Sequence, residues 1–207
     1  MNKSLLKLLL VCTPVVLTGC NWFVPLAFIL PDTKKVPAEY AKLEDQKVMV
    51  LLWAEPETLY DYPYVRYELG EYIGDKIRAN VDGVQVVNER KIEDHLHRHP
   101  EAAMDPEEVG EHFGAQMVVY IELLEFQIRD PEAPDLLQGK VEASIRIHDL
   151  TGESGAPDVQ ELESVSVTCP DNPMLYTATA PIVVRNETYK LFAEEVARKF
   201  YEHEEKL

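Results

Sequence analysis

The chain contains 207 residues, of which 46% are hydrophobic and 28% are charged. This composition is typical of a globular protein, and the length is sufficient for one domain with a sizeable hydrophobic core. The formal net charge of −17 argues against nucleic acid as a partner, because phosphate groups require a basic surface. The same charge argues against electrostatic attachment to anionic lipid, so we interpret the acidic residues as a solvated surface.

The amino terminus has the pattern of a bacterial lipoprotein signal. Lys3 and Lys7 provide a positively charged start, and a short apolar stretch follows them. The stretch ends in four residues that resemble the bacterial lipobox at every position: Leu17, Thr18, Gly19 and Cys20. The thiol of cysteine is the only side chain that can take the diacylglycerol thioether. The pattern therefore predicts a signal peptide over residues 1–19, a processing signal in the first three of these residues, and lipid, including palmitate, on Cys20.

An uncleaved transmembrane anchor is the alternative, because residues 8–30 are apolar over about the length that crosses a bilayer. Polar residues, a glycine and prolines interrupt this stretch, and such breaks suit a cleaved signal better. With Cys20 acylated, residues 22–30 can lie at the membrane interface. In the enterobacterial sorting rule, Asp directly after the lipidated cysteine favours the inner membrane. Asn21 stands at that position here, so the rule favours the outer membrane. We therefore expect a lipid-anchored, periplasm-facing protein of the cell envelope.

Residues 20–46 are predicted to form the lipidated amino terminus and a tether, and residues 47–207 an α/β domain. The continuous apolar run 48–52 is typical of a central strand that is covered on both faces. A single apolar stripe at helical spacing predicts a helix over residues 65–77, and a short strand is expected over residues 84–87.

Two shorter helices are predicted from their capping residues. Asn88 can cap a helix that continues to about His97. Asp105 is a second N-cap, Pro106 follows it at the first helical position, and Gly114 is a natural left-handed terminator.

Three strands and a final helix complete the pattern. Residues 117–126 form the longest predicted strand. Residues 141–147 alternate between apolar and polar side chains, which predicts one solvent-facing side, and a returning strand is expected over residues 165–169. The last helix is predicted over residues 186–203. Its outer face carries two ion pairs at the favourable four-residue spacing: Glu194 with Arg198, and Glu195 with Lys199.

The order of the elements is therefore β-α-β-α-α-β-β-β-α. The first three strands require helical crossovers, and the later strands can pair as hairpins. We predict an α/β fold with a single mixed β-sheet of about five strands flanked by three to four helices.

Two short segments carry a family resemblance. Residues 108–120 look like a helix, a Gly-Ala turn and a strand, and residues 145–153 look like a strand that ends in Asp before Thr-Gly. Both are similar to the α/β domain shared by the TolB amino-terminal region, the curli-secretion lipoprotein and the lipoprotein activators of penicillin-binding proteins. The resemblance covers about residues 45–203. It implies an envelope adaptor, assembly factor or pore subunit whose domain has no catalytic residues.

Histidines form the most suggestive cluster for chemistry. His95 and His99 are four residues apart and could share a metal on one face of a helix. The glutamate of a metalloprotease helix is missing, and Arg98 would repel a cation. We predict no metal site, and an envelope metalloprotein or hydrolase that uses this pair is an alternative. The sequence has neither a Gly-x-Ser-x-Gly motif nor a Gly-rich phosphate loop, so we expect no enzyme, no cofactor and no small-molecule substrate.

The predicted contact surface for a partner consists of four tyrosines: Tyr60, Tyr62, Tyr64 and Tyr67. Tyrosine is favoured at interfaces because it combines a large, rigid contact area with a polar group. A packed helix terminus is the other interpretation of this cluster.

These features predict a non-enzymatic envelope lipoprotein that acts as an adaptor or assembly factor through contacts with another envelope protein. An oligomeric secretion-channel subunit is a further alternative. It would require amphipathic hairpins long enough to span a membrane, and residues 125–140 are too short and too polar for that role.

Overall fold

The computed structural model describes residues 33–129, 133–152, 158–177 and 180–206. The chain divides into two units. The smaller unit holds residues 1–36 and 204–207, and in it β1 (Thr33–Val36) pairs with β7 (His203–Lys206) in a two-stranded sheet that was not predicted. The larger unit, residues 37–203, holds the α/β fold. None of the helices in the described ranges combines the length and hydrophobicity that crossing a membrane requires.

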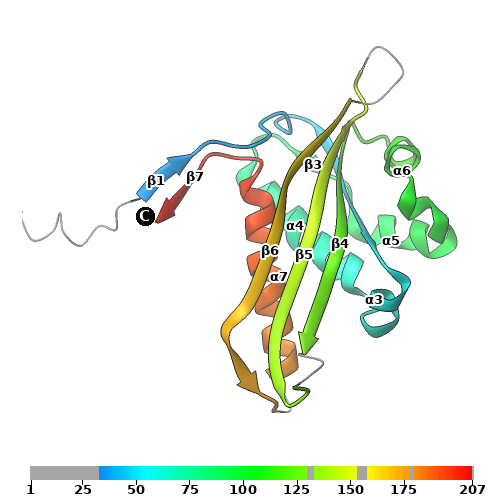
Figure 1. Ribbon diagram of the computed structural model, residues 1–207. Helices are drawn as coiled ribbons and strands as arrows, with labels where there is room; N and C mark the ends of the chain where they lie inside the picture. The colour runs from blue at the N-terminus through cyan, green and yellow to red at the C-terminus, as the bar shows by residue number, and fades with distance from the viewer. Residues whose placement is uncertain (1–32, 130–132, 153–157, 178–179, 207) are drawn as a thin grey trace, which may run out of the picture. The chain divides into compact units, whose positions relative to one another are not determined.

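The larger unit is built on a five-stranded mixed sheet with the order β3-β2-β4-β5-β6 (Figure 1). β2 pairs in parallel with both β3 and β4. β5 pairs antiparallel with both β4 and β6. The strands are β2 (Lys47–Ala54), β3 (Gln85–Val86), β4 (Met117–Arg129), β5 (Leu136–Asp149) and β6 (Asp158–Leu175). The predicted fold class, the mixed sheet of about five strands and the order of the predicted elements along the chain are confirmed.

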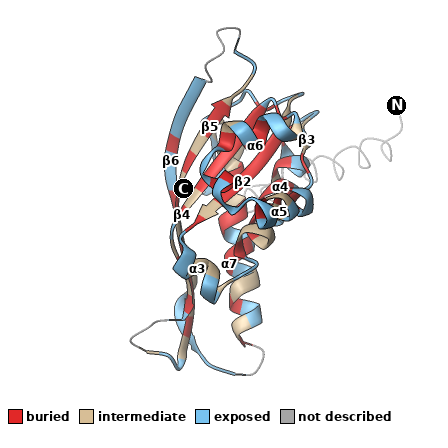
Figure 2. Cartoon of the chain, turned by 90° about the vertical axis from the view of Figure 1, so that its right-hand side faces the viewer, coloured by how far each residue is buried: buried red, intermediate tan, exposed pale blue. Residues whose placement is uncertain are grey.

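Helices form a layer on each face of the sheet. On one face lie α4 (Val65–Asn80) and α7 (Ala180–Arg198), and on the other lie α5 (Glu89–Arg98) and α6 (Pro106–Phe113). The apolar run of β2 serves both layers, because alternate side chains of a strand face opposite ways. Figure 2 shows the resulting burial of β2 and β4 between the layers.

The antiparallel half of the sheet is covered differently. In β5, Val141, Ala143 and Ile145 are buried towards α7, whereas Glu142 and Ser144 between them are only half-buried. The predicted solvent-facing side of this strand is confirmed. One long helix, α7, therefore supplies the helical cover for β5 and β6.

Local capping chemistry sets the ends of α5 and α6 as predicted. The Asn88 side chain accepts a hydrogen bond from the Lys91 amide, and Asp105 Oδ1 accepts one from the Glu108 amide at 3.0 Å. Gly114 ends α6 in the left-handed conformation with φ of +61°.

The carboxyl-terminal helix differs from the prediction in both boundaries. α7 begins at Ala180 rather than residue 186, because Ala180 and Val184 are buried and this burial favours an additional helical turn. It ends at Arg198 rather than residue 203. The amide of Phe200 bonds the carbonyl of Ala197, three residues back, and this tighter turn closes the helix.

One of the two predicted ion pairs is wrong for the same reason. Glu194 and Arg198 lie 3.7 Å apart, as expected. Glu195 instead contacts Arg198 at 2.6 Å, and Lys199 contacts Glu39 at 2.7 Å. Lys199 lies beyond the helix end, so it no longer stands one turn from Glu195.

Two short helical elements were not predicted. They are α3 (Pro56–Asp61), which joins β2 to α4, and the 3₁₀ helix η1 (Pro100–Met104), which joins α5 to α6. The core also extends into the segment assigned to the tether. Tyr40 and Leu43 are buried, and the Tyr40 hydroxyl lies 3.6 Å from the sulfur of Met117.

The close approach of α7 to β5 depends on Gly139. A Cβ at this position would collide with Cβ and Oγ1 of Thr188, which is fully buried and donates a hydrogen bond to the Val184 carbonyl at 2.8 Å. We expect Gly139→Ala to lower the free energy of unfolding by about 1–3 kcal/mol, the usual effect of overpacking. Urea denaturation measures it. Ser166→Ala, on the exposed side of β6, is the control, and equal stability of both variants would contradict the prediction.

Candidate functional site

The structure separates the four tyrosines of the predicted contact surface. Tyr60 in α3 and Tyr64 before α4 are 85% and 71% exposed. Tyr62 is half-buried towards β4, and Tyr67 is half-buried towards α5. Only the first two therefore have side chains that are largely free for a partner.

Tyr62 connects the segment between α3 and α4 to the sheet through a ring contact and a hydrogen bond. Its ring packs edge-on against Phe126 with 4.7 Å between centroids and an interplanar angle of 82°. Its hydroxyl accepts a hydrogen bond from the Ile128 amide at 3.3 Å. Tyr62 thus places α3 beside the carboxyl end of β4.

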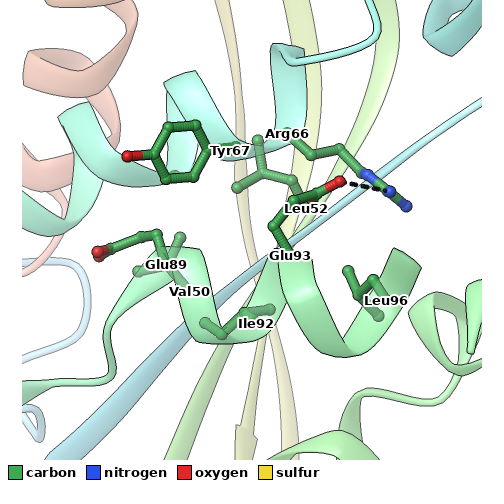
Figure 3. Close-up of a pocket in the computed structure, with 9 residues that line it drawn as sticks. Val50, Leu52, Arg66, Tyr67, Glu89, Ile92, Glu93 and Leu96 are labelled. Atoms are coloured by element: carbon green, nitrogen blue, oxygen red, sulfur yellow. Dashed lines mark hydrogen bonds and ion pairs between the residues drawn. The ribbon is translucent and has the colours of Figure 1, made fainter. Parts of the chain in front are cut away.

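Tyr67 lines a separate, small cavity between α4, α5 and β2 (Figure 3). Its volume of about 10 Å³ suits one water molecule rather than a ligand. Arg66 beside it contacts Glu93 at 3.1 Å, while its buried Nε has no hydrogen-bond partner among the described residues. A bound water at this position would satisfy that group.

Glu89 on the same cavity has a structural role. Its buried carboxylate accepts hydrogen bonds from Arg78 at 2.8 and 3.0 Å. Burial raises the pKa of Glu89, and the nearby Arg78 partly opposes this increase. The pair ties α4 to α5, and Figure 3 shows the Glu89 side chain at the edge of the cavity.

Several large apolar side chains of α3, of the segment before α4, of the end of β6 and of the start of α7 are exposed. We call this surface the apolar end. It consists of Tyr60, Tyr64, Leu175, Tyr176, Ile182 and Val183. In Figure 1, β5 begins and β6 finishes at the lower end of the sheet near the start of α7, and α3 lies higher, beside the end of β4. Ile182 and Leu175 are 56% and 72% exposed, which is unusual for large apolar residues.

A cavity of about 480 Å³ opens within this end. Its volume is within the range of small-molecule sites. The lining residues come from α3, the end of β4 and the first turns of α7: Asp61, Tyr62, Ile128, Arg129, Pro181, Ile182 and Arg185. The cavity therefore combines an apolar wall with two guanidinium groups and one carboxylate.

Arg185 has spare hydrogen-bonding capacity. Its nearest carboxylate oxygen, on Glu68, lies 3.6 Å away, and the other oxygen of Glu68 accepts a hydrogen bond from Tyr189 at 3.0 Å. The buried Nε of Arg185 has no hydrogen-bond partner in the described part of the chain. Burial, followed by the charge of Glu68, raises the pKa of Tyr189, so this hydroxyl stays protonated.

Arg129 is held by an aromatic ring rather than by a carboxylate. Its guanidinium lies 4.6 Å from the ring centroid of Tyr176. Within the described ranges it makes no ion pair with Asp or Glu. Arg129 and Arg185 thus leave donors available at the same cavity.

The histidine candidates lie at a different place. The rings of His95 and His99 are 5.0 Å apart, and His112 of α6 stacks on His95 at 4.3 Å. Burial, and then the nearby His112 and His99, lower the pKa of His95. No group of three His, Cys, Asp or Glu side chains in the described ranges is arranged to hold a metal ion.

The remaining predicted site residues lie outside the described residues. These are Leu17, Thr18, Gly19 and Cys20, so the lipidation site stays a prediction. The sequence did not predict Ile182 and Arg185 as site residues, because α7 was expected to begin only at residue 186. Arg129 of β4 was not predicted either. The available signal was the apolar run from Pro181 to Val184, followed directly by an arginine.

No protein-family model and no curated protein matches the chain. Distant likeness exists to solved structures. The PelC dodecamer from Paraburkholderia phytofirmans is 13% identical, with 83% of this chain and 99% of that chain covered and a TM-score of 0.45. Lipoprotein GNA1162 from Neisseria meningitidis is 17% identical, with 70% and 97% covered and a TM-score of 0.39. Hypothetical protein CT253 from Chlamydia trachomatis is 15% identical, with 73% and 96% covered and a TM-score of 0.43.

Likeness at this level assigns neither a family nor a function. The resemblance to the TolB, curli-secretion and penicillin-binding-protein activator group is not confirmed by these comparisons.

The contacts of the tyrosines predict unequal effects on stability. Tyr62→Ala removes the edge contact with Phe126 and the acceptor for Ile128, so we expect a loss of about 2–3 kcal/mol, somewhat below that of a fully buried aromatic. Tyr60→Ala removes an exposed ring, and its effect should stay within about 0.5 kcal/mol. Urea unfolding of both variants measures the difference. A Tyr60→Ala loss as large as that of Tyr62→Ala would show that Tyr60 is also a packing residue.

Proposed function

We propose that this protein is a non-enzymatic lipoprotein of the bacterial cell envelope that binds another envelope protein through the apolar end. One observation carries the proposal: the sequence Leu17-Thr18-Gly19-Cys20 behind a positively charged, apolar amino terminus. This sequence supports both the location of the protein in the cell envelope and its attachment to a membrane through lipid.

Attachment through acyl chains fits the physical chemistry of the segment. Each buried methylene contributes about 0.8 kcal/mol, and several chains on one residue make release from the bilayer slow. The apolar residues 22–30 would add interfacial contact next to Cys20. The large negative charge then keeps the α/β unit in solution beside the membrane. Asn21 favours the outer membrane as the place of attachment.

The apolar end is the surface that supports partner binding. Large apolar side chains that stay exposed on the elements around one cavity support an interaction site. Tyr60 and Tyr64 supply the large, rigid side chains that are enriched at protein interfaces. Leu175 and Ile182 extend the surface with aliphatic contacts. This arrangement supports an adaptor or assembly role.

Neither alternative from the sequence gains a specific supporting observation. The pair His95 and His99 meets His112 in a stack of rings, which does not by itself indicate a metal site. Zinc analysis of the purified protein tests this alternative directly, since stoichiometric metal that is lost on mutation of either residue would favour it.

The anchoring half of the proposal predicts a loss of lipid in Cys20→Ser. The serine hydroxyl cannot form the thioether, so the precursor should stay uncleaved and unlabelled when cells are grown with radioactive palmitate. Cys12→Ser, which changes a thiol inside the signal peptide, should keep both processing and label. Equal labelling of the Cys20→Ser chain would remove the basis of the proposed localisation.

The binding half predicts position-specific crosslinking in living cells. A photoreactive phenylalanine analogue at Tyr60 should give a discrete adduct with another envelope protein, because this ring is 85% exposed on the apolar end. The same analogue at His97, an exposed position on α5, is the control and should give no such adduct. Identical adducts from both positions, or none from Tyr60, would argue against this surface.

A further inference from the structure

We propose that the 480 Å³ cavity of the apolar end binds a single-chain amphiphile with an anionic head, which contacts Arg129 and Arg185 while its hydrocarbon chain lies on Tyr62, Ile128 and Ile182. This goes beyond the proposed adaptor role, because it assigns a small-molecule ligand. It concerns only residues of the larger unit and needs neither the lipid on Cys20 nor a protein partner.

The shape and lining of the cavity suit such a ligand. Sites for small molecules measure about 300–1,000 Å³ and combine apolar walls with a few polar groups that fix orientation. Here the apolar wall is formed by a tyrosine ring, two isoleucines and a proline from three different elements. The side chain of Ile182 is 56% exposed at the cavity, so a hydrocarbon chain laid against it would remove apolar surface from water.

The charges favour an anionic head. Two of the lining side chains are guanidiniums and one, Asp61, is a carboxylate, so the lining carries a net positive charge in a chain of net charge −17. The planar guanidinium group suits the paired oxygens of a carboxylate or phosphate. Asp61 would repel an anion placed beside it, which orients the head towards the arginines.

Neither arginine is saturated by its present partners. Glu68 lies 3.6 Å from Arg185 and is shared with Tyr189, and the buried Nε of Arg185 has no hydrogen-bond partner within the described residues. The ring of Tyr176 supports Arg129 from one face, and no carboxylate within the described ranges pairs with this guanidinium. The side chain of Arg185 is 37% exposed, so its terminal N–H groups, rather than the buried Nε, are the donors that an anion in the cavity would reach.

The start of α7 also favours an anionic head over a cationic one. Pro181 and Ile182 of its first turn line the cavity, and the amino terminus of a helix carries a partial positive charge. This contribution is secondary to the arginines, since Pro181 has no amide hydrogen. A cationic head would be repelled by Arg129, by Arg185 and by the partial positive charge of the helix end, and it would be attracted by Asp61 and by Glu68 beside Arg185.

The experiment uses the full chain in native membrane vesicles. Dodecanoate that carries a photoreactive diazirine in its chain is added, the vesicles are irradiated, and labelled peptides of the purified protein are identified by mass spectrometry. We expect label on peptides that contain Ile128 or Ile182. Unlabelled dodecanoate should compete with the probe, and dodecylammonium, with the same chain and the opposite head charge, should compete at least about tenfold less well.

Variants test the role of the guanidiniums. Arg129→Gln combined with Arg185→Gln should reduce labelling about tenfold or more, because each arginine provides charge-assisted hydrogen bonds. Arg198→Gln, at the other end of α7, is the matched control and should label like the parent chain. Ile182→Asn, which keeps both arginines, should also weaken labelling, and circular dichroism of each variant shows whether the fold is retained.

Two anionic sources can be distinguished in the same assay. Competition by palmitate alone indicates a free fatty acid, and equal competition by lysophosphatidylglycerol indicates a lipid headgroup. The proposal is overturned if the probe labels no peptide of this cavity, if dodecylammonium competes as well as dodecanoate, or if the double variant labels as strongly as Arg198→Gln. The Cys20→Ser chain should label normally, so failure here is separate from failure of the lipoprotein assignment.

Discussion

The packing of α7 across β5 and β6 is the contact on which the rest of the structure depends. The antiparallel half of the sheet has this helix as its main cover, and Phe192 and Val196 of α7 are fully buried in the core. The helix can approach so closely because Gly139 has no side chain opposite Thr188. Without that contact the inner face of β5 would be exposed to water, and α7 would lose the surface that supports its long apolar stripe.

The same contact creates the candidate site. α7 begins at Ala180, and its first turns reach the level of α3 and the end of β4. Ile182 lies on the outer face of α7 and remains exposed, whereas Val184, two residues on, is buried on the inner face. On the other side of the cavity, Tyr62 is held in place by its contact with Phe126. The cavity is therefore a consequence of where the first turns of α7 lie against Tyr62 and the end of β4.

Electrostatics distinguish this end from the rest of the surface. Several basic side chains elsewhere lie against carboxylates, as in Arg78 with Glu89 and Arg146 with Glu122, both at 2.8 Å. Such pairs tie elements together in a chain that has an excess of acidic residues. Arg129 instead lies on the ring of Tyr176, and Arg185 lies near the ring of Tyr189 with the Glu68 carboxylate 3.6 Å away. Two guanidinium groups beside apolar side chains form a local basic site that the acidic overall composition does not indicate.

The sequence by itself determined the features that depend on neighbouring residues: the doubly covered strand at residues 48–52, the caps at Asn88 and Asp105, and the one-sided alternation at residues 141–147. These features also predicted the element order and the mixed sheet. Only the tertiary structure decided where α7 begins, which tyrosines are exposed, and that two arginines share a cavity. Those outcomes depend on burial against segments far away in the chain, and local periodicity carries no information about such contacts.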